Sequence, residues 1–149
     1  MTSGRPGEGS PRFVFALLAA GICVLDCGLG LAADQFPFDR DLLLDAAPMR
    51  PAKRVPILMV APDGNATIDL WCKTIPAHID LSDNAIKIEP GPLPEGLPEM
   101  MSKDQCTTQR IQADEEFLAV VSQVTAWRKE GGAVVLIGPK KLKFWPAMN

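Results

Sequence analysis

Apolar and polar residues alternate from Ala66 to Lys73 more strictly than anywhere else in the chain. Ala66, Ile68, Leu70 and Cys72 take every second position, with polar or amphipathic residues between them. Side chains at alternate positions of a strand point to the same face. The pattern therefore predicts a strand with one face on a core, and such a strand needs other strands beside it.

Similar runs on both sides of this strand predict two hairpins. Residues 57–60 are a short apolar run, and the turn-forming sequence PDGN at 62–65 joins them to the alternating strand. Residues 77–81 and 86–88 alternate in the same way around the sequence SDN. Residues 42–44 are also apolar and fit either a strand or a helical turn.

The last third of the chain predicts one helix followed by two strands. Asp114 is a favourable N-cap residue, and Gly131 can turn the chain out of the helix. An apolar stripe with helical spacing runs between them and contains Phe117, Val120, Val121, Val124 and Trp127. Residues 133–137 and 141–145 are the closing strands, and the lysines of the last one are typical of an exposed sheet edge.

The chain length and composition fit one small domain. Its 149 residues suit a single core, and its 14 Pro and 12 Gly argue against a helical bundle. The predicted fold class is α+β: a small β-rich domain with a curved, mainly antiparallel sheet and one helix packed across it.

The N-terminal segment predicts export. Residues 13–25 are uncharged and mostly apolar, whereas spanning a bilayer takes about 20 such residues. Small residues precede a cleavage site after Ala32. Residues 1–32 are therefore interpreted as a signal peptide and residues 33–149 as the mature domain, in the periplasm or secreted.

Two alternatives concern the same segment. Cys23 and Cys27 invite a lipoprotein interpretation, but Ile22 and Asp26 precede them where lipoprotein processing needs a small residue. The other alternative is an uncleaved anchor, and the membrane would then be contacted only through the signal segment.

The charge and the residue types exclude several function classes. A net charge of -3 and a pI near 5.1 argue against nucleic-acid binding. One His, no Tyr and no phosphate-binding glycine motif give no support for a metal, a cofactor or an enzyme. The lone His78 is predicted to be exposed and non-catalytic.

Removal of the signal peptide leaves two cysteines, Cys72 and Cys106. Two cysteines in an oxidising compartment usually pair, so a structural disulfide is predicted. Two buried thiols or a reactive pair are the alternatives.

Trp71 and Trp145 are the candidate partner-binding residues, because a large ring with a polar edge is a common interface anchor. The alternative is that both cover the rim of the core. Trp127 is predicted to lie in the core.

In the order of these features the chain resembles the META domain family, which includes the bacterial heat-shock protein HslJ. The resemblance rests on the hairpin that reaches Cys72, Met100 and Met101 before Cys106, the sequence DEEF at 114–117, and the closing strands VVLIG and KLKFW. Where the family has the motif Gly-Cys-Asn, this chain has Trp71, Cys72 and Lys73.

The resemblance covers residues 38–146 and implies an envelope or secreted protein with links to stress and without enzymatic activity. The expected function is therefore binding of an envelope protein or a small ligand. The alternative is a secreted inhibitor that uses the proline-rich loop at residues 90–98, where four prolines restrict the backbone.

Overall fold

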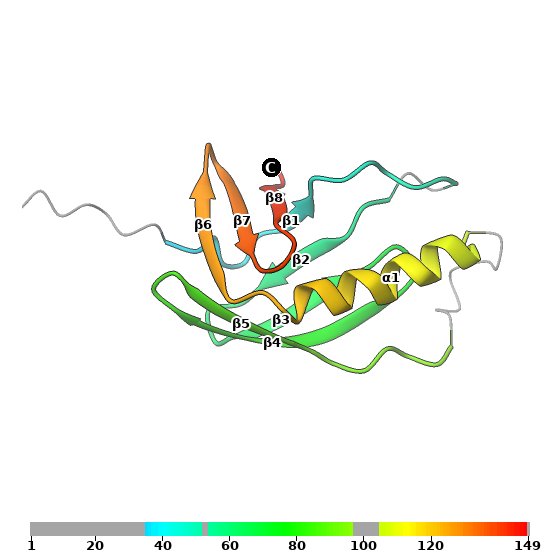
Figure 1. Cartoon of the computed structure of the whole chain (residues 1–149), viewed down its shortest axis with the longest axis horizontal. Coiled ribbons are helices and arrows are strands. Elements are labelled where there is room, and N and C mark those ends of the chain that lie inside the picture. The colour runs from blue at the N-terminus through cyan, green and yellow to red at the C-terminus, as the bar shows by residue number, and fades with distance from the viewer. Residues whose placement is uncertain (1–34, 52–53, 97–104, 149) are drawn as a thin grey trace, which may run out of the picture. The chain divides into compact units, whose positions relative to one another are not determined.

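The computed structural model describes residues 35–51, 54–96 and 105–148. Within them the chain forms a closed antiparallel barrel in which strands that are consecutive in sequence are neighbours (Figure 1). The elements are β1 (Leu42–Leu44), β2 (Ile57–Val60), β3 (Asn65–Asp69), β4 (Thr74–Ser82), β5 (Ala85–Pro90), α1 (Thr108–Val121), β6 (Ala126–Glu130), β7 (Ala133–Ile137) and β8 (Leu142–Pro146). The predicted signal peptide and its alternatives lie outside the described residues, as do Met100 and Met101.

The barrel is built on the predicted alternation. Leu42 pairs with Leu58, Leu58 with Ile68, and Ile68 with Ile75, which places one inward-facing row across four strands. Each of the four side chains is at most 1% exposed. Both predicted hairpins are confirmed, and residues 42–44 form a strand. The alternating strand ends at Asp69, so its predicted extension to Lys73 is wrong: the N–H of Leu70 donates to the carbonyl of Lys73 at 2.7 Å and the chain turns there into β4. The residues that are described contain no helix long and apolar enough to cross a membrane.

The sheet closes into a barrel, whereas the prediction was only of a curved sheet. β1 pairs with both β2 and β8, so that Leu43 lies between Ile57 and Trp145. The prediction that β8 is an exposed edge is therefore wrong. Closure removes the free edges of a sheet by satisfying the backbone groups of its first and last strands.

The helix begins at Thr108 and not at Asp114. Thr107 is the N-cap residue, and its hydroxyl accepts a hydrogen bond from the backbone N–H of Arg110 at 3.4 Å. Asp114 lies inside the helix on its buried face. Sequence reasoning chose the wrong cap because aspartate and threonine both favour that position.

The helix ends at Val121, so the predicted extension to Trp127 is wrong. The N–H of Thr125 donates to the carbonyl of Ile137 at 2.9 Å, and strand pairing continues through β6. Trp127 is 3% exposed and lies in the core, as predicted, although it stands on a strand. Gly131 and its neighbour have φ angles of 57° and 88° and form the β6–β7 turn rather than a helix end.

The helix packs against the same core as the strands. Its buried face consists of Arg110, Asp114, Phe117 and Val121, which follow one another at helical spacing. Phe117 and Val121 belong to the apolar cluster that fills the barrel. One antiparallel sheet and one helix thus share a single core, which confirms the predicted class in its coarser form.

Candidate functional site

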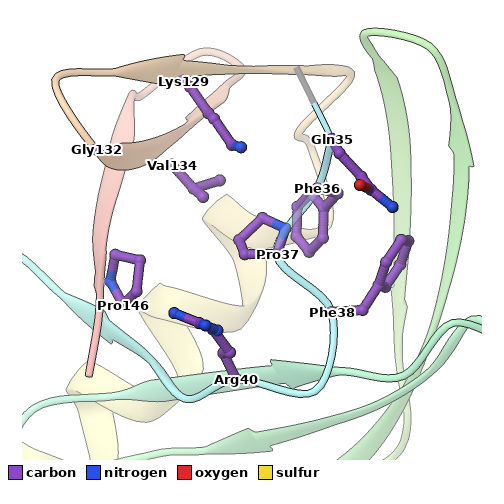
Figure 2. Close-up of a pocket in the computed structure, with 9 residues that line it drawn as sticks. All are labelled: Gln35, Phe36, Pro37, Phe38, Arg40, Lys129, Gly132, Val134 and Pro146. Carbon is purple, nitrogen blue, oxygen red and sulfur yellow. The ribbon is translucent and has the colours of Figure 1, made fainter. Parts of the chain in front are cut away.

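A cavity of about 480 Å³ opens where three parts of the chain meet: residues 35–40, the β6–β7 hairpin and the end of β8 (Figure 2). We call it the Arg40–Lys129 pocket. Its volume lies in the range of small-molecule sites. It is lined by Gln35, Phe36, Pro37, Phe38, Arg40, Lys129, Gly132, Val134 and Pro146.

Aromatic packing holds the first wall of this pocket in place. Phe36 is 4% exposed, and its ring meets that of Trp127 edge-on at a centroid distance of 5.1 Å. The ring of Phe38 follows at 5.5 Å from that of Phe36. Asp39 then takes a φ of 55°, and its N–H donates to the carbonyl of Val60 at 2.8 Å. These contacts turn the chain immediately before Arg40.

The charge of the pocket is positive. Arg40 and Lys129 are exposed, and Figure 2 shows the ends of both side chains directed into the cavity from different elements. No ion pair among the described residues includes either of them, whereas the neighbouring Arg128 pairs with Glu130. Two converging cations beside apolar walls favour a ligand that has an anionic group and an apolar part.

The two candidate tryptophans lie outside this pocket. Trp71 is 6% exposed, so it covers the core and is not an exposed anchor. Trp145 is 42% exposed, and its Nε1 donates to Asp45 at 3.2 Å while Lys143 lies 4.5 Å above its ring. A partner-binding role for Trp145 stays a prediction.

Cys72 and Cys106 lie side by side. The Sγ of Cys106 is 4.0 Å from the carbonyl oxygen of Cys72, and both residues are buried. The structure holds both as thiols, so the disulfide itself stays a prediction. Burial, together with a hydrogen bond to the Cys106 side chain, raises the pKa of Cys72 to about 12. That thiol is therefore protonated and a poor nucleophile at neutral pH.

A buried polar pair beside the cysteines was missed by sequence reasoning. Asp114 is 1% exposed and accepts hydrogen bonds from the N–H groups of Trp71 at 2.9 Å and Cys72 at 3.2 Å. Arg110, also 1% exposed, donates to the carbonyls of Gln105 at 2.6 Å and Met49 at 3.4 Å. The two side chains thus tie α1 to the β3–β4 turn and to the β1–β2 loop.

Burial raises the pKa of Asp114 to about 6, against its usual 3.8, even though the two N–H groups oppose the shift. The folded state therefore holds this proton more tightly than the unfolded state does. We expect the stability contributed by Asp114 to be greatest below about pH 4 and to fall as the pH rises to about 6. Urea unfolding of the wild type and of Asp114→Asn across this range measures the effect as a difference between the two proteins. A constant difference would contradict it.

His78 is exposed, as predicted, and its Nε2 lies 3.3 Å from Asp80. The described residues include no group of three His, Cys, Asp or Glu side chains that could hold a metal ion. No family model, curated protein or solved structure that was compared with the chain matches it. The META resemblance therefore stays a prediction.

Proposed function

We propose that this chain is an exported, non-enzymatic domain of the META type that binds a small anionic ligand in the Arg40–Lys129 pocket. The observation that carries the proposal is the convergence of two cations without ion-pair partners among the described residues on one cavity of small-molecule size. A carboxylate, sulfonate or phosphate would lie between Arg40 and Lys129. The apolar part of the ligand would pack on Pro37 and Pro146, which are half-buried.

The lining of the pocket supports binding rather than catalysis. Apart from the amine of Lys129, its described lining contains none of the side chains that usually act as nucleophiles or proton acceptors, namely carboxylates, His, Cys and hydroxyls. The pocket instead offers two positive charges, a planar guanidinium group and apolar walls, and such groups bind a ligand without reacting with it.

Anilinonaphthalene sulfonate is a suitable probe because it joins one sulfonate to an aromatic body. We expect the double variant Arg40→Ala/Lys129→Ala to bind it about 30-fold more weakly than the wild type, at ~1 kcal/mol for each exposed charged contact. The measurement is a fluorescence titration, repeated at higher salt, where screening should weaken binding to the wild type.

Arg128→Ala is the matched control for this titration. Arg128 is next to Lys129 on β6 but is paired with Glu130, so its removal should leave the affinity within about twofold. Equal binding by the double variant and the wild type would refute the proposal, and so would an equal loss in the control.

The restraint of the proline-rich loop supports the alternative function, that of a secreted inhibitor. The N–H of Gly91 donates to the carbonyl of Pro76 at 2.8 Å, and Nζ of Lys73 donates to the carbonyl of Pro94 at 2.6 Å. These bonds restrain the first part of the loop, and such restraint lowers the entropy cost of inserting a loop into an enzyme. Residues 97–98 of this loop lie outside the described residues.

A further inference from the structure

The barrel has its weakest seam between β5 and β6. These strands meet through one residue pair, Ala85 with Ala126, whereas every residue of β6 pairs with β7. The β4–β5 turn ends opposite Trp127, whose N–H donates to the carbonyl of Asn84 at 2.9 Å. Figure 1 shows the β6–β7 hairpin extending past this turn. Within the part of the chain that the structure describes, residues 128–130 therefore have a strand partner on one side only.

The backbone of Lys129 points to this open edge. In an antiparallel strand the N–H and C=O groups of alternate residues point to the same side. The N–H of Trp127 points toward β5, so the N–H and C=O groups of Lys129, two residues on, point the same way but lie past the turn. Residues 128–130 are exposed. Such an edge is a template for an added strand.

Lys129 thus presents two different features to a ligand. Its side chain is directed into the Arg40–Lys129 pocket (Figure 2), and its backbone borders the open edge of β6. The ammonium group and the backbone of one lysine are separated by its side chain, which is about as long as two extended residues of ~3.4 Å each. The end of a peptide carries a carboxylate at this spacing from N–H and C=O groups that can pair with a strand.

We propose that the anion bound in the Arg40–Lys129 pocket is the C-terminal carboxylate of a peptide whose backbone adds as a strand to the edge of β6 at Lys129. This inference rests on the proposed function and names the class of partner for the same site. The last side chain of the peptide is apolar, because it packs on the half-buried Pro37 and Pro146. Strand addition supplies affinity through the backbone, and the two cations select the chain end.

Three probes separate the contributions of the carboxylate and the peptide backbone. The first is an acetylated peptide of three alanines and a C-terminal leucine with a free carboxylate, and the second is its C-terminal amide. The third, 4-methylpentanoate, keeps the charge and the apolar part of leucine but has no peptide groups. In calorimetric titration we expect the acid peptide to bind with saturation and about tenfold or more tightly than either other probe.

The same titration with two variants tests the cations. Arg40→Ala should weaken binding of the acid peptide by about fivefold, because it removes one of the two charges that face the carboxylate. Arg128→Ala should change it by less than about twofold, because Arg128 is paired with Glu130.

Hydrogen exchange reads the edge of β6 directly. The acid peptide should slow the exchange of the Lys129 N–H by about tenfold or more, because this group becomes bonded to the peptide. The N–H of Arg128 points to β7 and is the internal control, with an expected change of less than about twofold. 4-Methylpentanoate should slow neither.

The inference is overturned if the acid peptide shows no saturable binding, if its amide or 4-methylpentanoate binds equally well, or if the exchange of the Lys129 N–H does not change. Anilinonaphthalene sulfonate distinguishes this failure from failure of the proposed function. Its binding still depends on Arg40 and Lys129 if only the peptide is the wrong partner, and does not depend on them if the anionic site itself is wrong.

Discussion

We expect the replacement of Asp114 with alanine to lower the free energy of unfolding by about 3 kcal/mol in urea denaturation at about pH 4, where the contribution of Asp114 is greatest. The carboxylate is 1% exposed and is the acceptor for the N–H groups of Trp71 and Cys72. Its removal leaves two buried donors without their partner and leaves a small void. Each effect is destabilising, and the two act on the same turn.

Glu115→Ala is the control for this variant, because Glu115 is adjacent in the helix and exposed. Its effect should stay within about 0.5 kcal/mol. A loss below about 1 kcal/mol for Asp114→Ala would show that water or a local shift replaces the carboxylate, and would contradict its role as the tie between α1 and the β3–β4 turn.

The second large effect concerns the cysteines. If Cys72 and Cys106 pair after export, each single alanine variant loses the same bond, so each should cost about 3 kcal/mol and the double variant little more. Alanine is preferred to serine because a buried hydroxyl would add a separate cost. The measurement is urea unfolding of the four proteins under oxidising conditions.

Repeating the series with a reductant supplies the internal control. Reduction should lower the stability of the wild type by about the same 3 kcal/mol and should bring it close to the single variants. Independent and additive losses, or a wild type that does not respond to the reductant, would mean that the two residues act as packed thiols.

The hairpins and the inward-facing positions of their strands were predictable because they depend on local alternation and turn residues. The PDGN turn and the alternation that follows it specify a hairpin without knowledge of the rest of the chain, although the alternation continues past the end of β3 at Asp69. Barrel closure was not predictable in this way, because it pairs Leu43 with Trp145 from opposite ends of the domain. The predicted start of the helix was wrong because Thr107 and Asp114 are both favourable N-cap residues, and the sequence does not show which of them the helix uses.

The Arg40–Lys129 pocket could not be predicted either, because it also depends on contacts between distant parts of the chain. Arg40 and Lys129 are ordinary surface charges in the sequence, and only the fold brings both to one cavity. The buried pair did leave a signal: Arg110 and Asp114 are one helical turn apart and continue the face of Phe117 and Val121. Charged residues on an apolar helix face could therefore have been read as buried and bonded.

Mapping the anionic probe by nuclear magnetic resonance tests the central claim most directly. In amide spectra of the isotope-labelled protein, titration with anilinonaphthalene sulfonate should shift the signals of Phe36, residues 38–40, Lys129 and Val134 together, with one saturation curve. The double variant Arg40→Ala/Lys129→Ala should lose those shifts. Shifts confined to another part of the molecule, or scattered over the surface without saturation, would contradict an anionic-ligand site in the Arg40–Lys129 pocket.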